Sequence, residues 1–157
     1  MITFFRKLLI ISLMLFSPSV IAEKTILVIG DSLSAGYGLS PSKGWVNLLK
    51  RIQQHASQYR VINSSISGET TGNGLSRLPK ALKEYKPAIT IIQLGANDGL
   101  RGFGISLIRK NLEKMVVLAK GANSKVLLLG MRLPLEYSGL YSNRFHQIYL
   151  DERSAMK

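Results

Sequence analysis

The sequence predicts a single three-layer α/β domain with a parallel sheet between two layers of helices. Four short apolar runs rich in β-branched residues alternate with amphipathic stretches, and near-continuous apolar strands of this kind are typical of parallel sheets covered on both faces. Apolar side chains spaced by three and four residues indicate the helices. The predicted strands are 25–29, 59–62, 88–94 and 125–129, and the predicted helices cover 45–52, 75–85 and 105–119 and begin again at 145.

The composition excludes several classes of protein. The chain has 157 residues, of which 46% are hydrophobic and 19% charged, so it has the length and apolar content of one globular domain rather than a disordered chain. It has no cysteine, which excludes a disulfide scaffold, a thiolate nucleophile and a cysteine-ligated metal site, and it has only two histidines. We therefore expect chemistry that uses hydroxyl, carboxylate, amide or lysine groups.

The first 22 residues have the pattern of a secretory signal peptide. Arg6 and Lys7 precede the apolar run Leu8–Phe16, and small residues lead up to Ala22. A membrane anchor is the alternative, but a span needs about 20 predominantly apolar residues, and a proline interrupts this stretch early. We expect cleavage after Ala22 and an exported domain of residues 23–157 that is periplasmic or secreted.

The chain is strongly basic, with 21 Lys and Arg against 9 Asp and Glu and a formal net charge of +12. The basic residues are dispersed over separate segments, and no basic run interleaves with aromatic residues as in many nucleic-acid-binding proteins. We therefore interpret them as solvated helix faces and expect no nucleic-acid partner. Transient attraction to an anionic membrane surface is the alternative.

Glycine-rich and polar segments follow the first three predicted strands. In a parallel α/β sheet the ligand crevice lies beyond the carboxyl ends of the strands, so these segments form the candidate site. Ser32 follows a glycine directly after the first strand, which is the place of a nucleophile on a sharp strand-to-helix turn. Gly68 after the second strand offers a backbone N–H, and Asn97 after the third offers a neutral carboxamide that suits an oxyanion.

Taken singly, each of these segments also has a simpler interpretation. The segments that carry Gly68 and Asn97 are consistent with ordinary polar turns. The segment that carries Ser32 is consistent with a plain turn or a phosphate-binding loop, although neither standard phosphate-loop pattern is present.

The three segments together resemble the sequence blocks of the SGNH (GDSL-type) hydrolases. They read GDSLSAGYG at 30–38, ISGETT at 66–71 and GANDG at 95–99. Within that superfamily the chain resembles the bacterial periplasmic esterases that act as acyl-CoA thioesterases, lysophospholipases and arylesterases, because the third block continues as GANDGLRGF and RLP follows at 132–134. The resemblance covers residues 24–152 and implies the flavodoxin-like α/β/α fold of that superfamily.

The resemblance implies a role for each candidate residue. Ser32 would be the nucleophile, and its own N–H, the N–H of Gly68 and the side chain of Asn97 would form the oxyanion hole. Asp31 would organise the turn rather than react. The implied activity is hydrolysis of a small carboxylic ester or thioester by water through an acyl-serine, in a monomer that needs no cofactor or metal.

The sequence departs from the family pattern in one respect. The family supplies the base that activates the serine from an Asp-x-x-His block after a fifth strand, and residues 1–157 contain no such block. We expect His55 and His146 to be surface residues of helices rather than substitute bases. The expected domain is therefore incomplete at its C-terminus and nearly inactive. A non-catalytic remnant that binds acyl lipids and a nucleotide-binding flavodoxin-like protein are the alternatives.

Overall fold

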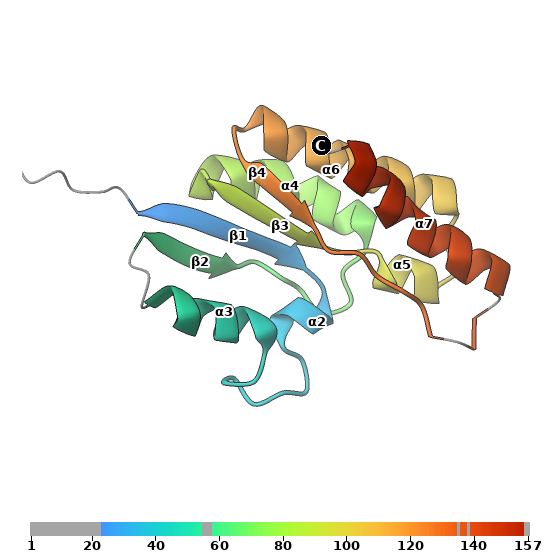
Figure 1. The fold of residues 1–157 in the computed structure, drawn as a ribbon, viewed down its shortest axis with the longest axis horizontal. Helices are drawn as coiled ribbons and strands as arrows, with labels where there is room; N and C mark the ends of the chain where they lie inside the picture. The colour runs from blue at the N-terminus through green and yellow to red at the C-terminus, as the bar shows by residue number, and fades with distance from the viewer. Residues whose placement is uncertain (1–22, 55–57, 135, 138, 156–157) are drawn as a thin grey trace, which may run out of the picture.

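A four-stranded parallel sheet with the order β2–β1–β3–β4 forms the centre of the molecule (Figure 1). The computed structural model describes residues 23–54, 58–134, 136–137 and 139–155. Each strand begins and ends within one residue of its predicted limits, which confirms the prediction of a parallel α/β sheet. The strands are β1 (Lys24–Gly30), β2 (Tyr59–Asn63), β3 (Ile89–Gln93) and β4 (Lys125–Leu128).

Helices cover both faces of the sheet, so the layers follow the predicted α/β/α order (Figure 1). α3 packs on one face, and α4, α6 and α7 pack on the other. The sequence prediction lacks α2 and α5, because helices of four or five residues are too short to show a periodic pattern. The helices are α2 (Ser32–Ala35), α3 (Trp45–Gln54), α4 (Thr71–Tyr85), α5 (Ala96–Leu100), α6 (Ile105–Gly121) and α7 (Gly139–Ala155).

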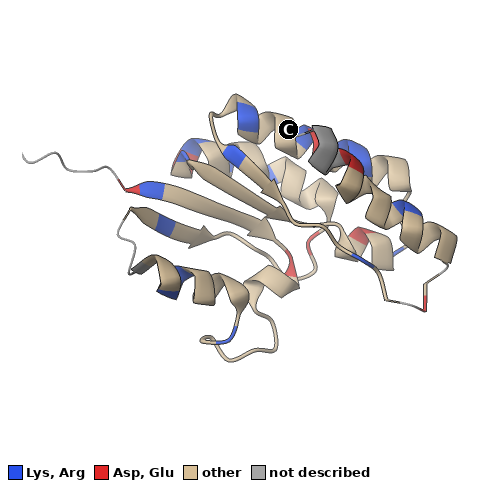
Figure 2. Ribbon diagram, in the orientation of Figure 1, with Lys and Arg blue, Asp and Glu red and all other residues tan. Residues whose placement is uncertain are grey.

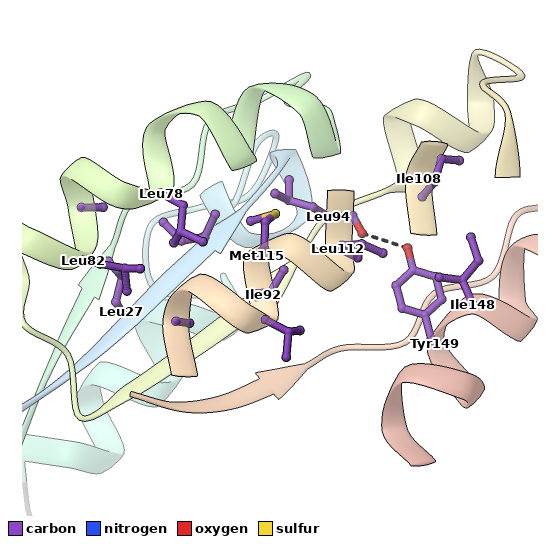
Figure 3. Close-up of a cluster of buried hydrophobic side chains, with 14 of the residues drawn as sticks. Leu27, Leu78, Leu82, Ile92, Leu94, Ile108, Leu112, Met115, Ile148 and Tyr149 are labelled. Atoms are coloured by element: carbon purple, nitrogen blue, oxygen red, sulfur yellow. Dashed lines mark hydrogen bonds between the residues drawn. The ribbon is translucent and has the colours of Figure 1, made fainter. Parts of the chain in front are cut away.

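The main hydrophobic core lies between the sheet and α4, α6 and α7 (Figure 3). Leu27 of β1, Leu78 of α4 and Leu112 of α6 are completely buried in it. α7 adds Phe145 and Tyr149, whose rings contact edge to face with their centroids 5.5 Å apart. The apolar periodicity of the sequence had assigned these side chains to the buried faces of their helices, and they are found there.

A smaller core lies on the opposite face of the sheet, beneath α3. It consists of Val46 from α3 and four sheet residues, Ile26, Val28, Val61 and Ile91. α3 lies over β1 and β2, and the part of this face that belongs to β4 is less covered, since Leu127 is 49% exposed. The two faces of the sheet therefore differ in how much apolar surface they bury.

The parallel register brings the carboxyl ends of three strands to one edge. Gly30 of β1 pairs with Gln93 of β3, and Val28 of β1 pairs with Asn63 of β2. The segments that follow these strands, which contain the three candidate site residues, therefore start side by side.

Two sequence-based expectations lie outside the described residues. They are the signal peptide at 1–22 and the surface position of His55. Among the helices in the described ranges, none is both long enough and apolar enough to cross a membrane.

Candidate active site

Ser32 begins the short helix α2 directly after β1. Asp31 caps this helix, and its Oδ1 accepts a hydrogen bond from the Leu33 N–H at 2.9 Å. A β-carbon at Gly30 would lie 2.6 Å from the β-carbon of Ser34, so the tight turn requires glycine at that position. Ser32 is half-buried, and within the described part of the chain its hydroxyl makes no hydrogen bond.

The carboxyl group of Asp31 is buried beside this turn. Its Oδ2 has no hydrogen-bond partner among the described residues. Burial raises the pKa of Asp31 above its ordinary value, although the hydrogen bond from the Leu33 N–H works in the opposite direction. The contact of Asp31 with the backbone of the turn agrees with the turn-organising role that the resemblance implies.

The segment after β2 lies against the end of β1 and carries Gly68. Ile66 donates its N–H to Gly30 O at 3.0 Å, which keeps this segment alongside the end of β1. The buried Glu69 forms an ion pair with Arg77 of α4, which ties the segment to that helix. Gly68 is exposed and has a φ of +79°, a backbone conformation that strongly favours glycine.

The segment after β3 forms α5 and carries Asn97. Asn97 Nδ2 donates to Glu69 O at 3.0 Å, and Arg101 Nη2 lies 3.4 Å from Gly68 O. These contacts join α5 to the segment that carries Gly68. Since Ile66 of the same segment is bonded to the end of β1, the structure brings all three predicted segments to one edge of the sheet.

The buried carboxylate of Asp98, the residue after Asn97, fixes α5 to two other helices. Asp98 is 1% exposed, and its two oxygens accept hydrogen bonds from the N–H and the hydroxyl of Thr71 in α4, at 2.9 and 2.6 Å. Asn111 of α6 donates to the same hydroxyl at 3.0 Å. Sequence reasoning missed this network, because its only sequence signal was one acidic residue next to Asn97.

A tyrosine from α7 holds the start of the same segment (Figure 3). The hydroxyl of Tyr149 donates to Leu94 O at 2.8 Å, and burial raises the pKa of this hydroxyl well above its ordinary range. A β-carbon at Gly95 would lie 2.2 Å from the Tyr149 oxygen, and Gly95 has a φ of +117°. Glycine is therefore required at the point where the chain turns from β3 into α5.

Comparison with known proteins assigns the chain to a family. Residues 28–155 match the model of the GDSL-like lipase/acylhydrolase family. The chain belongs to this family. It is 49% identical over 129 residues to esterase TesA of Pseudomonas aeruginosa, 46% identical over 144 residues to an arylesterase of Vibrio mimicus, and 44% identical over 128 residues to thioesterase 1/protease 1/lysophospholipase L1 of Escherichia coli K12.

These GDSL-like relatives are longer than this chain. The matches cover 82%, 89% and 82% of this chain, but 64% of the Pseudomonas esterase, 72% of the Vibrio arylesterase and 61% of the Escherichia enzyme. The chain thus spans about two thirds of the length of the curated relatives it matches.

Solved structures of GDSL-like and SGNH esterases share the fold. The crystal structure of TesA has a TM-score of 0.80 and 46% identity, and the match covers 85% of this chain and 74% of that chain. The psychrotrophic esterase EstA from Pseudoalteromonas sp. has a TM-score of 0.79 and 40% identity, with the same coverage. AlinE4, described as an SGNH-hydrolase family esterase, has a TM-score of 0.79 and 34% identity, covering 85% of this chain and 72% of that one. The similarity to SGNH hydrolases inferred from the three sequence blocks is confirmed.

In this GDSL-like domain the side chain of His146 is less exposed than the sequence predicts. It is half-buried on α7, and its Nδ1 lies 3.0 Å from Met131 O. A carbonyl oxygen only accepts, so Nδ1 is the donor in this contact. The expectation of a solvent-facing residue is therefore wrong, because the segment after β4 lies against this side of α7. In the described residues no hydrogen bond joins His146 to Ser32.

The acidic and histidine side chains do not form a metal-binding cluster in the described residues. No three of them lie close enough together to hold a metal ion. The three candidate residues at the carboxyl edge offer a hydroxyl, backbone amides and a carboxamide, and the carboxylates of Glu69 and Asp98 beside them are paired with Arg77 and Thr71.

Proposed function

We propose that this chain carries the acyl-transfer site of a secreted serine hydrolase that cleaves carboxylic esters or thioesters. The observation that carries the proposal is the meeting of three segments at one sheet edge, through the Ile66–Gly30 and Asn97–Glu69 hydrogen bonds. This arrangement puts a serine at the start of a helix close to the segments with the two other candidate residues.

The proposed reaction uses the three candidate residues in separate roles. Ser32 Oγ attacks the acyl carbon, and the carbonyl oxygen of the substrate becomes an oxyanion. The N–H groups of Ser32 and Gly68 and the carboxamide of Asn97 stabilise that oxyanion as neutral donors. Asn97 Nδ2 has two hydrogens, of which Glu69 O accepts one, and the other is available to the substrate. The alcohol or thiol then leaves, and water cleaves the acyl-serine.

Removal of the Ser32 proton is the step for which we assign no group. A serine hydroxyl is a weak nucleophile unless a base accepts its proton. In the described part of the chain neither a carboxylate nor His146 hydrogen-bonds to Ser32 Oγ. We therefore propose that residues 1–157 alone turn over substrate slowly, since an oxyanion hole and binding without a complete triad leave about 10³–10⁴-fold catalysis over water.

The names of the relatives support the substrate class. They are described as an esterase, an arylesterase and a thioesterase/lysophospholipase. We propose a small acyl ester or thioester as substrate and water as the second reactant, without a cofactor or nucleic acid, in a monomer. The acyl chain would lie between residues 99–104 and 133–141. Export to the periplasm through residues 1–22 belongs to the same proposal.

A non-catalytic acyl-lipid-binding protein is the second candidate. The unpartnered hydroxyl of Ser32 favours it, because binding needs no activated nucleophile. The match to an acylhydrolase family favours acyl ligands over the nucleotides of the flavodoxin-like alternative.

A gain-of-function experiment separates these two candidates. The unextended chain should hydrolyse p-nitrophenyl butyrate at or near background. Fusing the C-terminal Asp-x-x-His segment of a relative after Ala155 should restore turnover, and Ser32→Ala should abolish it. Ser67→Ala, an exposed serine of the neighbouring segment, is the matched control and should leave the restored turnover intact. An inactive but folded fusion, or turnover that survives Ser32→Ala, would overturn the proposed role of Ser32.

A further inference from the structure

The edge of the sheet opposite Ser32 is strongly basic. The C-terminal ends of α4 and α6 lie there, beside the starts of the strands, because the helices run antiparallel to the strands they connect (Figure 2). Two acidic residues, Glu23 and Glu84, are found at the same edge. We call the following five exposed lysines the basic edge: Lys24, Lys83, Lys86, Lys120 and Lys125.

An apolar hollow lies within the basic edge, between α4 and α6. Its volume is about 620 Å³, and Lys83 and Lys86 stand beside it. Val117 is 68% exposed and Leu118 is 39% exposed, so apolar surface faces the solvent among the lysines. The apolar lining of the hollow comes from Pro79, Leu82, Val117, Leu118 and Ala122. Lys120 and Lys125 line a second hollow at this edge, together with Asn123, Ser124 and Val126.

Stabilisation of helix ends explains only part of this charge. Lys83 and Lys120 lie in the last turns of α4 and α6, where cations interact favourably with the helix dipole. Lys24 and Lys125 begin strands, and a helix dipole gives no reason for their charge. Lys86 is the C-cap residue of α4, with a φ of +41°, so the dipole of α4 also favours its charge.

We propose that the basic edge docks the domain on the surface of an anionic phospholipid bilayer. The five ammonium groups would contact head-group phosphates, and Val117 and Leu118 would enter the boundary between head groups and acyl chains. A bilayer satisfies both parts of this surface, whereas a nucleic acid offers no apolar region for Val117 and Leu118. The hollow is also continuous with an exposed helix surface, so a single dissolved acyl chain would stay partly in water.

The position of β1 is consistent with this orientation. β1 starts at the basic edge, so the first described residues, Glu23 and Lys24, lie on the side that would face the bilayer. Docking leaves the carboxyl edge of the sheet, with Ser32, facing the aqueous phase. This inference about substrates rests on the proposed function. With Ser32 facing the aqueous phase, the domain would act on acyl donors dissolved in water rather than on lipids still embedded in the docked bilayer.

A labelled cysteine tests which edge meets the bilayer. The chain has no native cysteine, so Val117→Cys and Leu39→Cys each give one site for an environment-sensitive NBD label. Leu39 is 52% exposed on the segment after α2 and is the matched control. With phosphatidylglycerol-containing vesicles, the label at 117 should become brighter and blue-shifted, and the label at 39 should not change. A response at 39 alone, or at neither position, would overturn the proposal.

Charge substitutions provide a second readout, which does not depend on esterase activity. Each lysine near an anionic surface contributes about fivefold to binding, so the triple variant Lys83→Gln, Lys86→Gln, Lys120→Gln should bind phosphatidylglycerol vesicles about 100-fold more weakly in co-sedimentation. The control triple Lys43→Gln, Arg132→Gln, Arg144→Gln changes the net charge equally at exposed positions elsewhere and should lose far less. Residues 1–22 are the same in all variants. Equal losses in both triples would show that net charge alone drives binding and would overturn the proposal.

Discussion

The two sides of the candidate site are held by different parts of the fold. The segments that carry Gly68 and Asn97 hydrogen-bond to each other. They are also fixed to α4, α6 and α7 by an ion pair, a buried carboxylate and a tyrosine hydroxyl. Ser32 instead lies on the four-residue helix α2, which is held by the Asp31 cap and by hydrogen bonds of Ser34 with Gln93 of β3 and Asn63 of β2, and the Ser32 hydroxyl itself has no partner in the described residues.

This difference corresponds to two separate requirements of acyl transfer. Oxyanion donors act best when they are fixed before the reaction, because their stabilising effect then needs no reorganisation. The nucleophile depends instead on a base that accepts its proton. In the proposed site the hydrogen bond from Asn97 to Glu69 O orients one donor in advance, and a preformed oxyanion hole is the central claim of our account.

The largest expected effect is at Gly95, on the side of the site that carries Gly68 and Asn97. Gly95→Ala would place a β-carbon against the Tyr149 hydroxyl and force a non-glycine residue to a φ of +117°. We expect a loss of about 3 kcal/mol or more in the free energy of unfolding, measured by urea denaturation. Gly121→Ala, with no atom close enough to crowd the new β-carbon, should be nearly neutral. Similar values for the two variants would show that the turn before α5 is not a fixed point.

The second effect concerns the buried carboxylate of Asp98. In Asp98→Asn one of the two oxygens becomes an NH₂ group, so the N–H and the hydroxyl of Thr71 can no longer both donate to this side chain. We expect a loss of about 1–3 kcal/mol in unfolding free energy. Glu113→Gln, at an exposed position of α6, is the control and should be within error of the parent protein. A loss no larger than the control's would remove Asp98 as a support of the Asn97 segment.

The sequence predicted the strands and the position of the three candidate segments at one edge of the sheet, because both depend on local patterns. Apolar runs define β1 and β3, and glycine with polar residues after a strand marks a sheet edge. It did not predict the contact of Asp98 with Thr71 or that of Tyr149 with Leu94. These pairs are separated by 27 and 55 positions, and only the packing of the helices on the sheet brings them together. The half-buried setting of His146 was missed for the same reason.

A smaller loss is expected for Tyr149→Phe. This variant keeps the ring in the core and removes only the hydrogen bond to Leu94 O, which should lower the unfolding free energy by about 1 kcal/mol. Tyr137→Phe is the matched control, because its 3.4 Å contact with Leu100 O is long and exposed to solvent. If thermal denaturation shows equal shifts for the two variants, the hydroxyl of Tyr149 does not support this segment.

The smallest effect on the free energy of unfolding is expected at Asp31, next to Ser32, and it is the only expected increase. Burial raises the pKa of Asp31 in the folded protein, so this carboxyl keeps its proton at pH values where the unfolded chain has released it. Stability therefore falls as the pH rises from the unfolded pKa through the folded one. Asp31→Asn removes this penalty and keeps a side chain that caps helices well, so we expect a gain of about 0.5 kcal/mol at pH 7.

Thermal unfolding of Asp31→Asn and the parent protein at two pH values checks this sign. The gain should disappear at about pH 3, where the carboxyl is protonated in both the folded and unfolded states. A variant that is less stable than the parent at pH 7 would mean that the ionised Asp31 stabilises the turn.

The rate of phosphonylation of Ser32 tests the central claim most directly. A p-nitrophenyl alkylphosphonate reacts with serine through an oxyanion-like transition state, and mass spectrometry identifies the serine that is modified. In the fusion that carries the Asp-x-x-His segment, our account predicts an adduct on Ser32 that forms about 10²–10³ times more slowly in Asn97→Ala. Asn143→Ala, an exposed asparagine of α7, should not change the rate. Equal rates in Asn97→Ala and the parent fusion, or an adduct on a serine other than Ser32, would contradict a preformed oxyanion hole at this edge of the sheet.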